Sequence, residues 1–438
     1  MESFEQLAAA ARAANEAYAR FTAAPQEEFL PTDVFCGGGD NLLAYGDNLA
    51  FMGYLLQQKD LKGKIDLISV DPPFFTGNNQ QAKLRLDTGS GSAMLSTKAY
   101  SDSTQAGMVG YLTHLAVRFM AIRELLSETG ILAVHLDWHA VHYVKVLLDD
   151  IFGYDNLVNE LIWSYKSGGF ASRGFAKKHD TILVYAKSKV FYFRPSKEKS
   201  YNRGYKPYRF KGVEEFKDEL GWYTMVNRRD VLSVDMVGRS SPERTGYATQ
   251  KPVKLLDILI ESFCPEGGLC ADFYGGSGTL AAAAAASGRR FLTCDNSPAA
   301  VNTAAKRLSA AGVSFTVCSE ETQQPACSPQ CTFEETSLQI SMNGAGSYSL
   351  QTCTRDLQQL GLKGKTRARL EQALAANPLA LADFAASGTL QDGCFFAEKR
   401  FVPSSGGKEL IAQPLPGHTH IKVWDKFGGW MLYPLKKS

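Results

Sequence analysis

A chain of 438 residues is long enough for one large catalytic domain and one or two smaller modules, because single cores rarely exceed about 250–300 residues. Apolar residues make up 45% and charged residues 21%, which excludes a disordered or fibrous protein. The net charge of +2 gives no reason by itself to expect nucleic acid. We find neither the run of about 18–20 apolar residues that a membrane helix needs nor a signal peptide, so we expect no membrane contact and a cytoplasmic protein.

The N-terminal part of the chain predicts helix. Apolar residues recur at helical spacing over residues 2–21, and we assign residues 1–40 to an N-terminal helical segment. Short apolar runs then alternate with helical stretches. The elements predicted next are a strand at 65–70, a helix at about 107–129 closed by Gly130, a strand at 131–136, a helix at 141–152 and a strand at 181–186.

The same alternation resumes in the second half of the chain. It predicts a helix at 252–263, a strand near 269–273, a helix through the alanine run, a strand at 291–294 and a helix ending near Leu308. Strands alternating with helices indicate a doubly wound, mostly parallel α/β sheet. Residues 316–336 contain Pro, Ser, Thr and Gln and predict a linker, so we treat 337–438 as a separate C-terminal module of unknown function.

A glycine-rich turn follows the strand near 269–273. Glycines let a cofactor approach the backbone closely, and the helix that follows offers free N–H groups. Asp295 lies 23 residues after Asp272, at the end of the next predicted strand, where a carboxylate can bind ribose hydroxyls. This pattern alone also fits a nicotinamide-dependent dehydrogenase or a purely structural turn.

A second motif, Asp71-Pro72-Pro73-Phe74, comes directly after the strand at 65–70. Two prolines stiffen the backbone, so that the Asp71 carboxylate and the Pro72 carbonyl present two fixed acceptors. Two acceptors suit an amino group with two N–H donors, and Phe74 can stack on an aromatic ring. A rigid turn after a strand is the structural alternative.

In combination the two motifs resemble the amino-methyltransferases of DNA, in particular the β-class enzymes related to type III modification subunits. In that class the Asp-Pro-Pro-aromatic motif precedes the glycine motif, as Asp71 precedes Asp272 here. The resemblance covers about residues 40–308 and includes the blocks at 45–49, 135–139, 147–163, 179–187 and 243–252. Two departures are Phe273, where a proline is usual, and Ala248, also at a usual proline.

The resemblance implies a circularly permuted, seven-stranded Rossmann-like methyltransferase sheet formed by residues 41–187 and 246–315, with a target-recognition insert at 188–245. It implies S-adenosylmethionine as the cofactor and Asp71-Pro72-Pro73-Phe74 as the catalytic motif. The implied cofactor-binding residues are Asp47, Lys251, Pro252, Asp272, Tyr274, Gly276, Ser277, Gly278, Thr279 and Asp295.

The expected reaction is methyl transfer to the exocyclic amino group of a flipped base in double-stranded DNA, with N6 of adenine favoured by the initial Asp of the motif. The alternatives are N4 of cytosine, an amino group of RNA or a protein amide, a nicotinamide-dependent oxidoreductase, and a non-catalytic DNA-binding subunit. The protein partners left open are a second copy of the chain and a restriction subunit. The expected location is the nucleoid of a prokaryotic cell.

One segment is strongly basic within this neutral chain. Residues 162–211 contain 13 Lys and Arg against two acidic residues, interleaved with aromatic residues. Cations neutralise phosphates and exposed rings stack on bases, so we predict DNA contacts by Lys177, Lys178, Arg203 and Lys206. A solvated basic face with core aromatics is the alternative.

We expect no metal. His135, His139 and His142 are near helical spacing, but His135 ends a predicted strand, so core or surface histidines are the better interpretation. Cys327 and Cys331 could supply half of a zinc site, yet no second pair accompanies them and no histidine lies nearby in sequence. The nine cysteines show no repeating spacing, so free thiols are expected.

Overall fold

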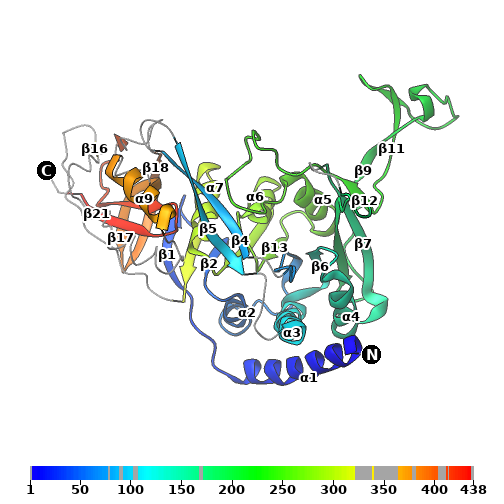
Figure 1. Ribbon diagram of the computed structural model, residues 1–438, viewed down its shortest axis with the longest axis horizontal. Coiled ribbons are helices and arrows are strands. Elements are labelled where there is room, and N and C mark those ends of the chain that lie inside the picture. The colour runs from blue at the N-terminus through cyan, green and yellow to red at the C-terminus, as the bar shows by residue number, and fades with distance from the viewer. Residues whose placement is uncertain are drawn as a thin grey trace.

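A computed structural model describes residues 2–76, 79–87, 92–101, 107–166, 171–320, 338–339, 364–376, 381–402, 411–412 and 414–435. Its main feature is a sheet of fourteen strands in the order β12-β7-β8-β6-β3-β13-β14-β2-β15-β1-β18-β17-β20-β21 (Figure 1).

Seven consecutive strands form the central part of this sheet. They are β7 (Leu157–Ser164), β8 (His179–Ala186), β6 (Leu126–Leu136), β3 (Ile65–Val70), β13 (Leu269–Asp272), β14 (Arg290–Asp295) and β2 (Leu42–Tyr45). All are parallel to one another except β8, which is antiparallel to both neighbours. The predicted permuted, mostly parallel α/β sheet is confirmed, because β3 from the first half of the chain lies beside β13 from the second.

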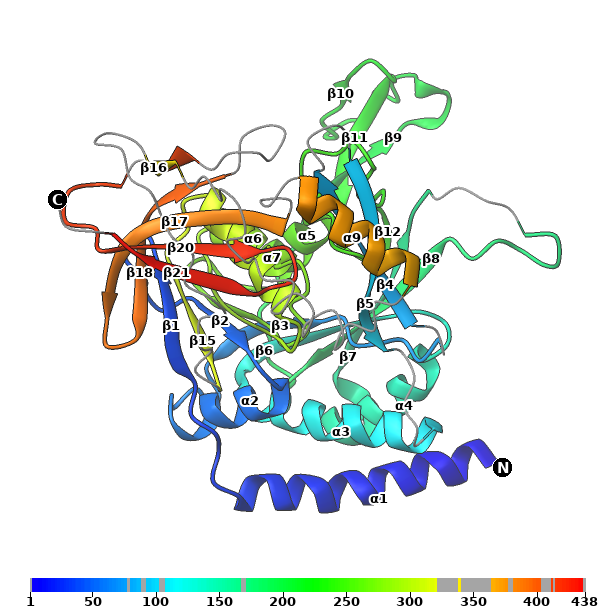
Figure 2. The same ribbon diagram turned by 60° about the vertical axis from the view of Figure 1, so that its left-hand side comes forward.

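Helices cover both faces of these strands, as a doubly wound fold requires (Figure 2). One face carries α2 (Asn48–Gln57), α3 (Gly107–Leu125) and α4 (Val141–Phe152), and the other α5 (Val253–Phe263), α6 (Thr279–Ala286) and α7 (Pro298–Ala310). Each face of the sheet has its own hydrophobic core, and the side chains of β6 alternate between them. Leu132 and Val134 belong to the core on the face of α2, α3 and α4, and Ile131 and Ala133 belong to the core on the face of α5, α6 and α7. The predicted N-terminal helix is α1 (Glu2–Ala23), which packs on α3 and contributes to the hydrophobic core on that face of the sheet.

The sheet continues past β2, where the sequence predicts no strands. Six further strands extend this edge: β15 (Phe315–Ser319), β1 (Leu30–Phe35), β18 (Cys394–Phe401), β17 (Ala382–Gln391), β20 (His420–Asp425) and β21 (Trp430–Pro434). The seven-stranded sheet is therefore only the centre of a larger one. At the opposite edge β12 (Val231–Ser233) pairs with β7.

These strands correct three predicted boundaries. The segment 1–40 is not wholly helical, because β1 lies within it, and the predicted linker 316–336 begins inside β15. Residues 337–438 do not form a separate module, because β18 pairs with β1 in the main sheet. Aromatic contacts also link the C-terminal strands to β1 and β15. The ring of Phe35 in β1 stacks on Phe315 of β15 with centroids 4.7 Å apart, and it lies 5.6 Å from the ring of Trp424 in β20. The remainder of the linker, with Cys327 and Cys331, lies outside the described residues.

The helix predicted at 107–129 is wrong at its end. Helix α3 stops at Leu125 and β6 begins at Leu126, so Gly130 lies inside the strand. A Cβ at Gly130 would lie 2.8 Å from the carbonyl oxygen of Ile65, so glycine here permits the close approach of β6 to β3 rather than closing a helix.

A narrow arm projects from the sheet within the predicted insert 188–245 (Figures 1 and 2). It contains a three-stranded sheet in the order β10-β11-β9, formed by β9 (Lys197–Tyr201), β10 (Phe216–Lys217) and β11 (Trp222–Asn227). The other described elements are η1 (Tyr154–Asn156), η2 (Arg203–Tyr205), β4 (Asn79–Asp87), β5 (Ser92–Ser101), β16 (Leu338–Gln339), α9 (Gly364–Ala376) and β19 (Ile411–Ala412). Among the described residues no helix is both long and apolar enough to cross a membrane.

Candidate functional site

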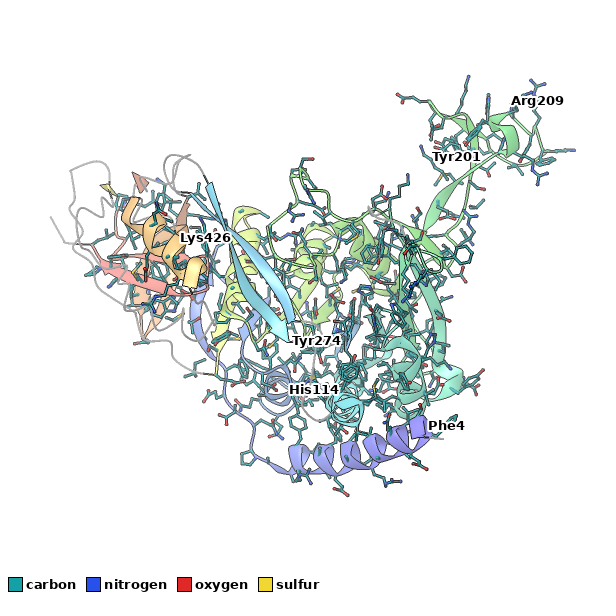
Figure 3. All side chains as sticks on the ribbon, in the orientation of Figure 1. Phe4, His114, Tyr201, Arg209, Tyr274 and Lys426 are labelled. Carbon is teal, nitrogen blue, oxygen red and sulfur yellow. The ribbon has the colours of Figure 1, made fainter. Side chains whose placement is uncertain are left out.

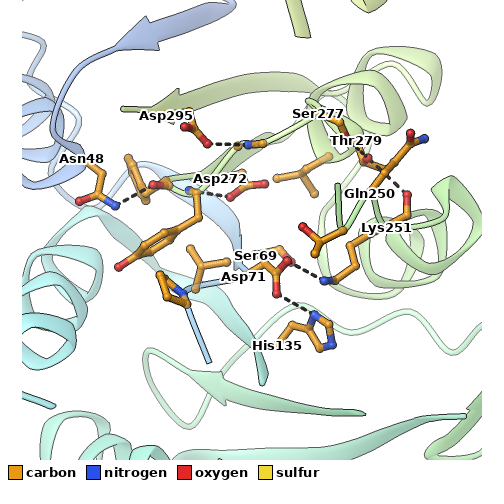
Figure 4. A pocket seen from close by; sticks show the side chains of 18 of the residues that line it. Asn48, Ser69, Asp71, His135, Gln250, Lys251, Asp272, Ser277, Thr279 and Asp295 are labelled. Atoms are coloured by element: carbon orange, nitrogen blue, oxygen red, sulfur yellow. Dashed lines mark hydrogen bonds and ion pairs between the residues drawn. The ribbon is translucent and has the colours of Figure 1, made fainter. Parts of the chain in front are cut away.

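The two predicted motifs meet at the carboxyl edge of the sheet. Strands β3 and β13 are adjacent and parallel, so Asp71, one residue after β3, and Asp272, at the end of β13, emerge at the same edge. A cavity of about 520 Å³ opens there, which is within the usual size range of small-molecule sites (Figure 4). Asp71, Asp272 and Asp295 all line it.

Asp71 is held by two basic side chains. Its Oδ2 accepts a hydrogen bond of 2.6 Å from Lys251 Nζ, and its Oδ1 lies 2.9 Å from His135 Nδ1 (Figure 4). Burial by itself would raise the pKa of Asp71, but Lys251 and His135 outweigh it and lower the pKa to about 2. His135 faces Oδ1 at hydrogen-bond distance and contributes to the lowered pKa. Asp71 is therefore an anion with a basic side chain beside each of its oxygens.

The rest of the Asp-Pro-Pro-Phe motif supports Asp71. Pro73 lines the cavity, and its carbonyl accepts a hydrogen bond of 2.7 Å from the Tyr111 hydroxyl. Pro72 and Phe74 are not among the residues that line the cavity. Pro72 is buried, and the ring of Phe74 lies 5.3 Å from that of His135. Phe75 has a φ of 61°, a strained conformation for a bulky residue that is typical of functional sites.

The glycine turn connects β13 to α6 in the way the sequence predicts. Gly278 is the N-cap of α6 with φ 69°, and a Cβ there would lie 2.7 Å from Cβ of Ala304, so only glycine fits. Gly276, with φ 48°, donates its N–H to Asp295 Oδ2 at 2.8 Å. Ser277 and Thr279 line the cavity with hydroxyls 3.0 Å apart. The turn therefore brings glycine backbone and two small hydroxyl side chains to the cavity wall.

Asp272 is a buried acid with an unusual pKa. Burial raises the pKa to about 8, and one hydrogen bond of 2.9 Å from the Tyr274 N–H opposes the shift without cancelling it. Asp71 and Asp295 raise it further, whereas Lys251 lowers it. A carboxyl group of this kind ionises readily only when a cation is placed beside it.

Asp295 and Asp47 line the cavity, and each of their four carboxylate oxygens already accepts a hydrogen bond. Burial raises the pKa of Asp295, whose Oδ1 accepts from the Ser297 N–H at 2.8 Å. Asp47 caps α2 by accepting a hydrogen bond from the Leu49 N–H, and it accepts a second hydrogen bond of 2.8 Å from Arg118 Nη2. Asp47 therefore has a clear role at the start of α2.

The cavity brings together most of the predicted cofactor-binding residues. Those lining it are Asp47, Lys251, Asp272, Tyr274, Gly276, Ser277, Thr279 and Asp295. Gly278 and Pro252 are not among them: Gly278 faces α7, and Pro252 is the buried N-cap of α5. Both shape the backbone behind the cavity wall.

Sequence reasoning missed His135. It assigned this histidine to the core or surface, whereas the structure places it in the cavity wall beside Asp71. Its other nitrogen, Nε2, lies 3.1 Å from Asp180 Oδ2, and Tyr165 donates its hydroxyl to Asp180 Oδ1 at 3.1 Å. The signal was available, because His135 ends β6, the strand next to β3. No group of three potential metal ligands occurs among the described residues.

Helix α3 supplies a second group that the sequence did not reveal. Tyr111, His114 and Arg118 line the cavity, and Arg118 Nε donates to Asn48 Oδ1 at 2.5 Å. Burial, together with the charge of Arg118, lowers the pKa of His114 to about 4. Helical spacing explains their shared face, but only the fold shows which face meets the cavity.

The predicted DNA-contact residues lie in two places. Lys177 and Lys178 precede β8, and Lys177 Nζ lies 3.2 Å from the ring centroid of the exposed Trp138. Arg203 and Lys206 are exposed in the projecting arm, which Figure 3 marks by Tyr201 and Arg209. In Figure 3 this arm stands well away from Tyr274 of the cavity. The basic segment is thus divided between the main body and the arm.

Comparison with known proteins gives a consistent result. A family model described as DNA methylase, covering N6 and N4 enzymes, matches residues 65–306, more than half of the chain. The type II methyltransferase M.KpnI of Klebsiella pneumoniae is 29% identical over 144 residues, which are 33% of this chain and 31% of that protein. The EcoPI Mod subunit, part of a type III restriction-modification enzyme of Escherichia phage P1, is 29% identical over 34% of this chain and 25% of its own length. The matches thus span about a third or less of these relatives.

Among solved structures, a DNA methyltransferase described as PvuII, cytosine-N4-specific, is similar with a TM-score of 0.43 and 12% identity. The similarity covers 64% of this chain and 90% of that one.

Proposed function

The chain belongs to the DNA methylase family, and from that premise we propose that it transfers a methyl group from S-adenosylmethionine to the exocyclic amino group of a base in double-stranded DNA. Adenine N6 is the proposed acceptor.

The observation that carries this proposal is the state of Asp71. Lys251 donates a hydrogen bond of 2.6 Å to one carboxylate oxygen, and the other oxygen, the buried Oδ1, lies 2.9 Å from His135 Nδ1. The carboxylate is thus held as an anion in the cavity wall, and its oxygens keep lone pairs that can accept N–H bonds from a bound group. An aryl amine fits, because it donates N–H bonds and becomes more nucleophilic as those bonds draw its lone pair out of the ring.

The residues present also fit the cofactor. S-adenosylmethionine carries an ammonium and a sulfonium charge, and Asp272 is a buried carboxyl group that needs a cation to ionise. Ribose hydroxyls can donate to Asp295, whose carboxylate lines the cavity. Gly276 has no side chain in the cavity wall, and a Cβ there would already crowd the Tyr247 ring at 3.3 Å, so glycine keeps this space open for a ligand. The sulfonium supplies the leaving group, so the protein's task is to bind, orient and exclude water.

A base inside a duplex cannot reach this cavity, so it must be flipped out at a cost of a few kcal/mol. Phe74 is part-buried with its ring beside His135 and Lys251, the two partners of Asp71, and stacking of the flipped base on this ring is part of the proposal. The arm and the basic residues before β8 offer charge for the phosphate backbone. A DNA substrate would place the protein on the nucleoid, and the similarity to a Mod subunit makes a restriction subunit or a second copy of the chain the partners to test.

Adenine is favoured over cytosine by the chemistry of the motif. An anionic carboxylate is a stronger acceptor than a neutral hydroxyl, and in the resembling enzymes an initial Asp accompanies adenine more often than cytosine. The family model covers both amines. The choice of adenine over cytosine therefore depends on the motif and not on the family match.

Mass spectrometry of nucleosides from duplex DNA treated with the purified protein and S-adenosylmethionine tests the function. N6-methyladenine is expected; N4-methylcytosine would replace the base but keep the chemistry. 5-methylcytosine, or methylation of RNA or protein only, would contradict the proposal. The Asp71→Ala variant should lose methyl transfer while its cofactor affinity stays within severalfold, because Asp71 is assigned to the amine.

A further inference from the structure

His135 occupies an unusual position between two carboxylates. Its Nδ1 lies 2.9 Å from Asp71 Oδ1, and its Nε2 lies 3.1 Å from Asp180 Oδ2. The imidazole is almost completely buried, with 7% of its side chain exposed, yet it lines the cavity (Figure 4). This buried histidine therefore has a carboxylate beside each ring nitrogen.

The partners of the ring determine where its proton lies. Asp180 is acceptor-only when ionised, so Nε2 must carry hydrogen to bond with it. The Tyr165 hydroxyl donates to the other oxygen of Asp180, and burial together with Asp180 raises the pKa of Tyr165 to about 12, which keeps it a donor. Nδ1 lies 2.9 Å from Asp71 Oδ1, a distance across which a proton can pass between the two atoms. With its hydrogen on Nε2 for Asp180, the neutral imidazole has Nδ1 as the nitrogen that can take up a proton from Asp71 Oδ1.

Aromatic rings fix the orientation of the imidazole. The rings of Trp163 and Phe74 pack against it with centroids 5.4 and 5.3 Å away, both edge to face. Trp163 is itself locked by a buried hydrogen bond of 2.7 Å from its indole N–H to the carbonyl of Val234. The ring of His135 is thus held for its contacts with Asp71 and Asp180.

The proposed reaction requires a proton acceptor at this point. When the amine takes up a methyl group, its nitrogen gains a bond and must lose a proton. Lys251 is an ammonium that donates to Asp71 and cannot accept, and Tyr165 reaches Asp180 rather than Asp71. Asp272 is assigned to a cationic group of the bound cofactor rather than to the amine. Asp71 and His135 are the acceptors that remain among the described charged groups around the ring.

We propose that His135 is the final proton acceptor of methyl transfer, acting through Asp71 and positioned by Asp180; this inference rests on the proposed function. The bond between sulfur and the methyl carbon breaks with its electron pair going to sulfur, and the amine lone pair forms the new bond to carbon. The N–H bond then breaks, its electron pair returns to nitrogen, and the proton passes to Asp71 Oδ1 and on to His135 Nδ1. The resulting imidazolium lies between the carboxylates of Asp71 and Asp180, which stabilise it.

Two variants separate this role from a structural one. His135→Ala removes the acceptor and leaves space for added imidazole. Asp180→Asn is nearly isosteric, but its amide can donate to Nε2, which moves the imidazole hydrogen to Nδ1 and blocks proton acceptance. His139→Ala is the matched control, because His139 also pairs with an aspartate, Asp137, at 2.6 Å, but does not line the cavity.

The measurements are the single-turnover rate against pH, cofactor and DNA affinity, and thermal stability. We expect both variants to lose about 10²–10⁴-fold in rate, the usual contribution of a general base, with both affinities within about threefold. The wild-type rate should rise with pH to a plateau; both variants should lose this rise, and imidazole should rescue His135→Ala but not Asp180→Asn. His139→Ala should behave as wild type.

A rate within about threefold of wild type for either variant, or an unchanged pH profile, would overturn the proposal. If His135→Ala fails to fold, the conservative Asp180→Asn variant decides. The same measurements distinguish failure of the proposed function from failure of the role proposed for His135. Wild-type protein that methylates no DNA refutes the proposed function, whereas active wild type, inactive Asp71→Ala and active His135→Ala refute only the role of His135.

Discussion

Cofactor binding should release a proton from Asp272. Burial raises the pKa of this carboxyl group to about 8, so about nine-tenths of free molecules carry the proton at pH 7. A bound cation favours the carboxylate and returns the pKa toward its ordinary value, so binding at pH 7 should release about 0.9 proton. The apparent affinity for S-adenosylmethionine should therefore rise about tenfold from pH 6 to pH 7 and level off above pH 8.

Isothermal titration in buffers of different ionisation enthalpy measures this proton directly. S-adenosylhomocysteine keeps the ammonium but lacks the sulfonium charge, and adenosine lacks both, so the three ligands identify the responsible cation. Adenosine should release no proton, and Asp272→Asn should abolish the release for all three ligands. Equal binding enthalpies in phosphate and Tris for S-adenosylmethionine would refute the assignment of Asp272 to a cationic group.

Three further results are expected. Asp295→Ala should weaken cofactor binding by about 1–3 kcal/mol in the same titration, for the lost ribose hydrogen bonds, and an unchanged affinity would place the ribose elsewhere. The residues predicted to contact phosphates are Lys177, Lys178, Arg203 and Lys206. Each alanine substitution should lower the slope of log DNA affinity against log salt by about one unit, and an unchanged slope would show that the substituted residue does not contact a phosphate. Lys422→Met should lower the free energy of unfolding by about 3–5 kcal/mol in urea, because it leaves the buried Asp33 carboxylate without its cation. The double variant Lys422→Met, Asp33→Leu should recover most of that loss, and a single variant as stable as wild type would show that the pair contributes little.

The sequence by itself determined the local elements and the identity of the two motifs. Helix α4 begins at Val141 and ends at Phe152 as predicted, because apolar spacing marks its buried face and Gly153, with φ 95°, can end it. Strand β3 and the turn around Gly278 were equally visible, since a buried parallel strand is apolar throughout and a left-handed N-cap needs glycine. Information of this kind lies within a few neighbouring residues.

Only the tertiary structure decided which distant side chains meet. The pairing of His135 with Asp71 and Asp180 depends on the order of β3, β6 and β8 across the sheet, which no local periodicity contains. The place of the C-terminal strands depends in the same way on β1, which pairs with β15 on one side and β18 on the other. Hydrogen bonding between strands joins residues that are far apart in sequence, and the free energy of that pairing comes from burial on both faces of the finished sheet.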